Sequence, residues 1–148
     1  MPETLSIRPG ALTLDELQAI HAGGRLLAID AAARQRIRAS AAVVQRAAAG
    51  DAPVYGVNTG FGKLASTRID ADRLDALQLN LIRSHSVGVG AALAPPVVRL
   101  MLATKAASLA RGHSGVREEV VDALVAVHNA GLVQIGRASC RERVYSSV

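Results

Sequence analysis

Apolar residues recur at helical intervals along most of the chain, and this spacing predicts about five helices. The first helix follows Thr13, which forms a capping box with Glu16, and it ends at Gly23-Gly24. The second is capped by Asp30 and runs to about Ala49. The apolar stripes of these two helices consist of Leu14, Leu17 and Ile20, and of Ile37, Ala41, Val44 and Ala48.

Three more helices are expected in the second half of the chain. The first of them ends with His85, before glycines at positions 88 and 90 interrupt the helical pattern. The next opens with Pro95-Pro96, because the first turn is where a helix tolerates proline. The last is capped by Ser114 and ends at Gly131. The apolar stripe of the last helix consists of Val116, Val120, Leu124 and Val127.

Two short segments near the N-terminus favour strand. They are residues 5–8, which precede the turn signal Pro9-Gly10, and residues 26–30. The whole pattern therefore predicts a mainly α fold with at most two short strands near the N-terminus. The helices are rich in alanine, which buries far less apolar area than leucine. We therefore expect further residues or other subunits to complete the core.

Composition places the chain among globular proteins. It has 148 residues, half of them apolar, which suits one domain. No apolar run approaches the roughly 18 residues that a membrane span needs, and the N-terminus lacks the pattern of a secretory signal. The formal charge is +5, or +3 without residues 136–148, and the remaining charges are spread over the helices without a basic stripe or stacking aromatics. We expect a cytoplasmic protein with no nucleic-acid partner and no membrane contact.

The cysteine and histidine positions indicate neither a disulfide nor a metal site. Cys140 is the only cysteine of the sequence, which excludes an internal disulfide. His21, His113 and His128 do not stand at metal-ligand spacing with His85, so zinc is not expected.

The loop at residues 51–64 is the main candidate for a functional site. Glycines at 56, 60 and 62 surround Tyr55 and Phe61, and glycine allows a backbone to approach a ligand closely. By residue type, Tyr55 suits either an aromatic anchor or a proton acceptor, since active sites can adjust the ionisation of a phenol. By residue type, His85 suits either a hydrogen-bonded position in the core or a catalytic position.

Two further segments carry a specific pattern: "YGVNTGFGKLASTRI" at residues 55–69 and "LQLNLIRSHSVGVG" at residues 77–90. Together they resemble the aromatic amino acid ammonia-lyase family. The likeness extends over about residues 5–133 and is closest to members that act on histidine. It implies the helical-bundle fold of the family, and an enzyme that eliminates ammonia from L-histidine to give trans-urocanate, the first step of histidine degradation.

The resemblance also implies roles for four residues. Tyr55 matches the catalytic tyrosine that takes the β-proton of the substrate. Gly62 matches a glycine that lines the pocket, and His85 matches the residue that recognises the substrate ring. Asn58 and His85 favour histidine over phenylalanine as the bound substrate, whereas tyrosine stays open because relatives that act on it can also carry this histidine.

The family uses methylidene-imidazolone, an electrophile built autocatalytically from an internal Ala-Ser-Gly. It also forms homotetramers whose sites combine residues of several subunits. This chain carries Ala138-Ser139-Cys140 in place of the tripeptide, so the resemblance does not assign the cofactor to these residues.

The family likeness stops at about residue 135. Residues 135–144, "IGRASCRERV", resemble the translation of a common sequencing adapter, so residues 136–148 are expected to be a tail outside the family. Residues 1–135 are then the N-terminal part of a lyase domain, truncated before Ala-Ser-Gly and expected to be inactive alone. A fragment of a tyrosine ammonia-lyase or aminomutase, or a non-catalytic helical interaction module, are the alternatives.

Overall fold

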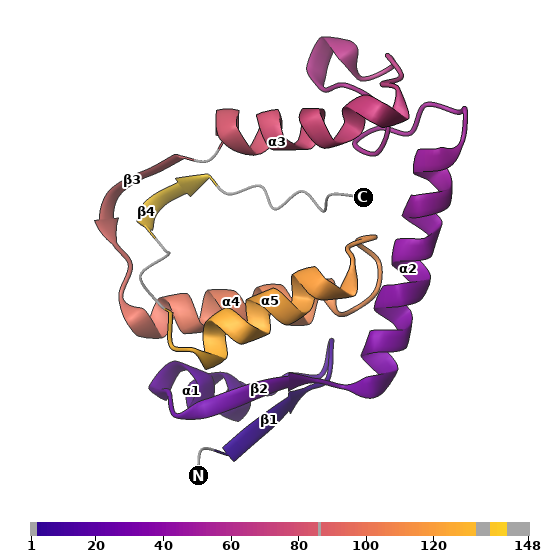
Figure 1. Cartoon of the computed structure of the whole chain (residues 1–148). Helices are drawn as coiled ribbons and strands as arrows, with labels where there is room; N and C mark the ends of the chain where they lie inside the picture. Colours follow the sequence, from indigo (N-terminus) through magenta and orange to yellow (C-terminus); the bar gives the residue numbers. More distant parts are fainter. Residues whose placement is uncertain (1–2, 86, 133–136, 142–148) are drawn as a thin grey trace.

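The computed structural model describes residues 3–85, 87–132 and 137–141 (Figure 1). Helices dominate the described residues, which confirms the predicted fold class. The helices are α1 (Leu14–Ala22), α2 (Ala31–Ala49), α3 (Leu74–His85), α4 (Pro95–Leu109) and α5 (Glu118–Asn129). The strands are β1 (Glu3–Ile7), β2 (Arg25–Ile29), β3 (Val87–Ala92) and β4 (Arg137–Arg141), and two short 3-10 helices are η1 (Gly62–Leu64) and η2 (Ala71–Arg73).

The base of the molecule is a β-α-β unit. β1 and β2 pair in parallel, with Ile7 opposite Ile29, and α1 is the crossover that a parallel pair requires. The predicted capping box of α1 is present, because the Glu16 N–H donates to Thr13 Oγ1 at 3.2 Å and the Thr13 N–H donates to Glu16 Oε2 at 2.8 Å. Both strands and this helix therefore form where the local pattern predicts them.

α4 and α5 cover this unit and close the hydrophobic core. The Arg99 side chain of α4 donates to the carbonyl oxygens of Ile20 at 3.3 Å and His21 at 2.6 Å, both in the last turn of α1. The core draws on β1, α1, β2, the first half of α2, α4, α5 and the segment before α5. Its buried members are Ile7, Ile20, Leu27, Ile29, Ala33, Ile37, Ala103, Ala106, Ala107, Leu109, Ala110, Val116 and Val121.

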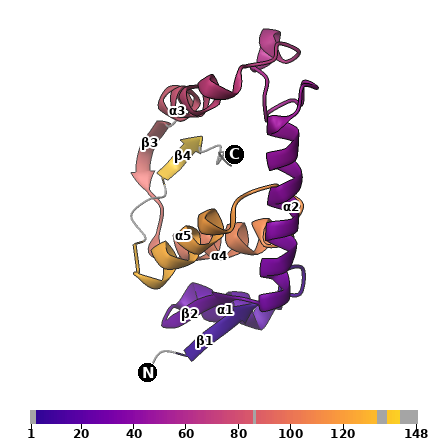
Figure 2. The same cartoon turned by 45° about the vertical axis from the view of Figure 1, so that its right-hand side comes forward.

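α2 leaves the base and carries the chain to α3, which stands apart from the base in both views (Figures 1 and 2). Asp30 caps α2 as predicted, since its Oδ1 accepts the N–H groups of Ala32 at 2.9 Å and Ala33 at 3.1 Å. Its 19 residues span about 28 Å. The buried residues of α2 are Ala33, Ile37 and Ala41, so its second half lies outside the core.

The prediction that Ser114 caps the fifth helix is wrong. α5 begins at Glu118, after Arg117, and no capping hydrogen bond from the Arg117 side chain occurs among the described residues. The preceding segment is held by tertiary contacts instead: the Gly115 N–H donates to Ser40 Oγ at 2.9 Å, and Val116 is buried. Gly115 also adopts a φ of +70°, which a right-handed helix does not contain.

The strand β3 was not predicted, because the glycines at 88 and 90 indicated only the end of a helix. It pairs with β4 in an antiparallel ladder, from Val87 opposite Arg141 to Ala92 opposite Arg137. Strand formation depends on a partner as much as on local preference. The paired residues lie about 45–54 positions further along the chain, beyond the reach of a local pattern.

Candidate functional site

A tight turn after α2 presents Tyr55 to solvent. The Val54 carbonyl accepts the N–H groups of Val57 at 3.0 Å and Asn58 at 3.2 Å. Gly56 has a φ of +78°, a conformation that glycine adopts without steric cost. The Tyr55 residue is 63% exposed. A fixed backbone therefore holds an accessible phenol.

The ring of Phe61 packs against the ring of Tyr55. Their centroids are 5.9 Å apart and their planes meet at 70°, an edge-to-face arrangement. Aromatic pairs of this kind contribute about 0.5–1.5 kcal/mol beyond the area that they bury. Phe61 therefore restricts the positions open to the Tyr55 ring.

Asn58 lies beneath the turn and is 1% exposed. Its Oδ1 accepts the Val54 N–H at 2.7 Å. Its Nδ2 donates to the carbonyl oxygens of Ala47 at 3.2 Å, Ala52 at 3.0 Å and, more weakly, Gly50 at 3.5 Å. The last carbonyls of a helix lack partners within the helix. The amide therefore joins the turn to the C-terminal end of α2.

The chain returns along the other side of Asn58. The Ile69 N–H donates to the Asn58 carbonyl at 2.8 Å, and the Gly60 N–H donates to the Thr67 carbonyl at 3.1 Å. Gly60 also packs closely on the next turn, since a Cβ at this position would stand 2.5 Å from Leu64 Cβ. The segment from 54 to 69 is thus a compact unit with its own hydrogen bonds.

Gly62 begins η1 with a φ of +60°. A Cβ at this position would meet no described atom within 4 Å, so the space beside its backbone is open. Open space next to a glycine suits a residue that lines a pocket. Its contact with a substrate stays a prediction.

His85 stands at the opposite end of α3 from the loop. The helix has 12 residues, which rise by about 18 Å, and it runs from η2 to β3 (Figures 1 and 2). The structure therefore brings Tyr55, Asn58 and Gly62 together in one loop. The His85 backbone lies outside that loop, at the far end of α3. The His85 side chain lies outside the described part of the structure, and its role stays a prediction.

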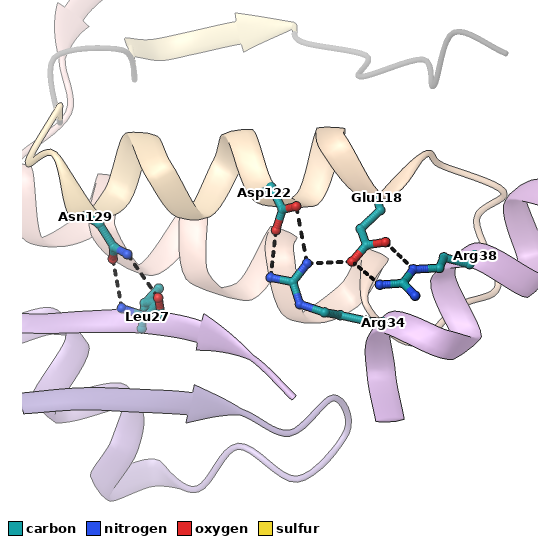
Figure 3. A network of polar contacts seen from close by, with 6 residues as sticks. All are labelled: Leu27, Arg34, Arg38, Glu118, Asp122 and Asn129. Carbon is teal, nitrogen blue, oxygen red and sulfur yellow. Dashed lines mark hydrogen bonds and ion pairs between the residues drawn. The ribbon is translucent and has the colours of Figure 1, made fainter. Parts of the chain in front are cut away.

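Ion pairs fix the first half of α2 against α5 (Figure 3). Arg34 reaches Glu118 Oε1 at 2.6 Å and Asp122 Oδ1 at 2.8 Å, and Arg38 also pairs with Glu118. The guanidinium groups of Arg38 and Arg34 lower the pKa of Glu118 to about 2. Hydrogen bonds to Asp122 and then Glu118 raise the pKa of Arg34. This network anchors the helix that carries the Tyr55 turn.

The contacts and burial of two residues at the end of α5 were not predicted from the sequence. Asn129 pairs with β2 as a neighbouring strand would: its Oδ1 accepts the Leu27 N–H at 2.8 Å and its Nδ2 donates to the Leu27 carbonyl at 3.0 Å (Figure 3). His128 is 5% exposed, and its Nε2 has no partner among the described residues. Burial lowers the pKa of His128. The burial of His128 could have been predicted from its spacing: it follows Val121 by seven residues, about two helical turns, and these are the two buried residues of α5.

In the described parts of the chain, no three His, Cys, Asp or Glu side chains gather where they could hold a metal ion. The helices described there are too short or too polar to cross a membrane. The described groups with a candidate chemical role are those of the loop around Tyr55.

Comparison with known proteins gives a consistent result. The profile of the family described as "Aromatic amino acid lyase" matches residues 12–135. The histidine ammonia-lyase of Paracidovorax citrulli (strain AAC00-1) is 59% identical over 132 residues, which cover 89% of this chain and 26% of that protein.

Solved structures show the same similarity. Histidine ammonia-lyase from Trypanosoma cruzi superposes with a TM-score of 0.76 at 40% identity, covering 86% of this chain and 24% of that chain. Tyrosine aminomutase from Streptomyces globisporus superposes with a TM-score of 0.78 at 30% identity, covering the same shares, 86% and 24%. The chain thus spans about a quarter of the length of the relatives that it matches.

Proposed function

Because the chain belongs to the aromatic amino acid lyase family, we propose that it forms the first part of an enzyme that eliminates ammonia from L-histidine. The product is trans-urocanate, and the reaction is the first step of histidine degradation. The observation that carries this proposal is the 59% identity to a histidine ammonia-lyase over 132 residues. The exposed phenol on a fixed turn supports it.

Tyr55 is the base of the proposed reaction. The Cβ–H bond of histidine breaks, and its proton passes to the Tyr55 phenolate oxygen. The electron pair of that bond forms the Cα–Cβ double bond, while the Cα–N bond breaks and the protonated amino group leaves as ammonia with the electron pair of the Cα–N bond. Proton transfer needs the two atoms within hydrogen-bond reach. A turn fixed by backbone hydrogen bonds and by the Phe61 ring suits this need.

The other residues of the proposal bind the substrate. Gly62 lines the pocket, where the space beside its backbone is open. His85 recognises the imidazole ring by hydrogen bonding, because each imidazole offers one donor and one acceptor nitrogen when neutral. Asn58 is the exception: the resemblance places it with them, as favouring histidine over phenylalanine, but its side chain is only 1% exposed, so we propose that it acts without direct contact with the substrate.

The residues present do not fit the formation of methylidene-imidazolone. The sequence contains no Ala-Ser-Gly, since Ala138-Ser139 is followed by Cys140. No step is therefore assigned to this electrophile, and we propose that the 148-residue chain alone is inactive.

The complete enzyme, in this proposal, is a cytoplasmic homotetramer. Exposed apolar side chains away from the base support association with further protein. On α3, Leu79 is 46% exposed and Ile82 is 48% exposed. Neighbouring apolar surface of this kind is usually covered in an assembly.

A tyrosine-directed lyase or aminomutase is the second candidate. The similarity to the tyrosine aminomutase of Streptomyces globisporus, with a TM-score of 0.78, favours it. A non-catalytic helical interaction module is the third, and it would share the fold without turnover.

A hybrid enzyme tests the proposal. Residues 1–132 replace the matching segment of the Paracidovorax citrulli histidine ammonia-lyase, and urocanate formation is followed by its ultraviolet absorbance. We expect turnover of histidine by the hybrid and none by the 148-residue chain. Tyr55→Phe should lower kcat by about 100-fold or more, which is what a lost general base costs. Val43→Ala, at an exposed position of α2, is the control.

A correctly assembled hybrid without turnover would contradict the proposal. Faster turnover of tyrosine than of histidine would favour the second candidate. Urocanate formed by the 148-residue chain would overturn the proposed inactivity.

A further inference from the structure

Backbone groups engage both polar atoms of the Asn58 side chain. Its two amide hydrogens face three carbonyl oxygens, at 3.0, 3.2 and 3.5 Å from Nδ2. Its Oδ1 accepts the Val54 N–H at 2.7 Å. An asparagine amide has two donor hydrogens, and this residue is only 1% exposed. Its donors are therefore committed to the fold.

These partners place Asn58 between the Tyr55 turn and its supports. Val54 directly precedes Tyr55 and bonds to Asn58 twice, through its N–H to the side chain at 2.7 Å and through its carbonyl to the Asn58 N–H at 3.2 Å. On the opposite side, the Asn58 carbonyl accepts the Ile69 N–H at 2.8 Å. One residue thus connects α2, the turn and the returning segment.

We infer that Asn58 is a positioning residue, which fixes the Tyr55 turn on the end of α2 and affects turnover through Tyr55 without touching the substrate. The part that concerns turnover rests on the proposed function; the part that concerns the turn rests on the hydrogen bonds alone. The hydrogen bonds at this position require a short side chain with one acceptor and two donors, which asparagine has. Alanine would leave the Val54 N–H without its acceptor, and aspartate would turn a negative charge toward three carbonyl oxygens.

Hydrogen exchange in the 148-residue chain tests the structural part. In Asn58→Ala, the Val54 amide should exchange about tenfold faster or more, since its buried acceptor has been lost. The Ile69 amide keeps its acceptor, the backbone carbonyl of residue 58, and should exchange faster only because the turn is no longer fixed to α2. Asn58→Ser, which supplies a hydroxyl oxygen as a possible acceptor, should give a smaller increase. Protection in α4 should stay unchanged in both variants. Asn129→Ala is the matched control, because it removes an amide that bonds twice to Leu27 in the base.

The hybrid enzyme tests the functional part. Asn58→Ala should lower kcat about 10–100-fold, because a small displacement of a catalytic group is costly. KM for histidine should change by less than about twofold, since ground-state binding is kept. In the Tyr55→Phe background, Asn58→Ala should lower kcat by less than about twofold, because the group that it positions is absent.

Two results would overturn the inference. One is unchanged exchange at Val54 in Asn58→Ala. The other is a rise in KM that persists in the Tyr55→Phe background, which would indicate direct contact with the substrate. An unsubstituted hybrid without turnover would count against the proposed function, whereas exchange at Val54 would still decide whether Asn58 fixes the turn.

Discussion

Replacing Gly115 with alanine tests how closely α2 approaches the segment before α5. A Cβ at this position would stand 2.1 Å from Val44 Cγ2 and 3.2 Å from Val44 Cβ. The backbone cannot withdraw freely, because the Gly115 N–H donates to Ser40 Oγ at 2.9 Å. Gly115 also has a φ of +70°, in the left-handed region. The substitution therefore meets a steric and a conformational obstacle at once.

The two costs are estimated separately. The left-handed conformation costs alanine about 1–2 kcal/mol. Forcing a methyl group into a packed contact costs about 1–3 kcal/mol. We expect Gly115→Ala to lower the free energy of unfolding by about 2–5 kcal/mol. This is a large share of the about 5–15 kcal/mol that stabilises a typical domain.

Urea unfolding of the chain, followed by far-ultraviolet circular dichroism, measures this loss. Gly10→Ala is the matched control, since Gly10 has a φ of +83° and no described atom within 4 Å of a Cβ. The difference between the two variants is the steric cost, about 1–3 kcal/mol. In a Val44→Ala background the nearest contact relaxes to the 3.2 Å of Val44 Cβ, so Gly115→Ala should cost less.

Equal losses of stability in Gly115→Ala and Gly10→Ala would refute the close approach of α2. A cost of Gly115→Ala that is unchanged by Val44→Ala would show that another contact causes it.

Four further substitutions, of which Glu119→Gln is a control, probe α5 by urea unfolding. The pKa of Glu118 is about 2 in the folded chain against an ordinary 4.5. The stability that the ionised Glu118 side chain contributes is therefore present above pH 4.5 and is lost as the pH falls toward 2. Glu118→Gln should remove this pH dependence of the free energy of unfolding, whereas Glu119→Gln, at an exposed position, should leave it in place. Burial lowers the pKa of His128 from 6.5, so stability should fall as the pH drops below 6.5, and His128→Leu should abolish that fall. Asn129→Ala should cost about 1–2 kcal/mol, because the Leu27 N–H and carbonyl lose their partner, and an unchanged midpoint would contradict this.

The beginnings of the helices were predictable where the signal is local. Thr13 and Asp30 cap α1 and α2 as expected, and Pro95 begins α4. Each signal acts over three or four residues, because a cap bonds to the first turn of its own helix. Ser114 carried the same local signal and failed, because its neighbours Gly115 and Val116 pack against distant residues.

In the candidate site, too, the residues were predictable and the contacts that support them were not. Tyr55, Asn58 and Gly62 lie close in sequence, so a motif within one loop was enough to select them. The supports of this loop were not predictable from that motif. The Asn58 amide bonds to carbonyls at the end of α2, whose residues carry no marker for this contact. Backbone carbonyls are chemically alike at every position, and only the folded chain selects which of them meet a side chain.

Local sequence patterns were enough to predict the helical class, the caps of α1 and α2, the two N-terminal strands and the loop that carries Tyr55, because periodicity and capping act over a few residues. Long-range contacts in the folded chain account for the late start of α5, the β3–β4 pair, the Arg34–Glu118 network and the partners of Asn58 and Asn129. Each of these joins backbone or charged groups from distant parts of the chain. Their pairing depends on which groups the core brings within hydrogen-bond distance, and residue type alone does not contain that information.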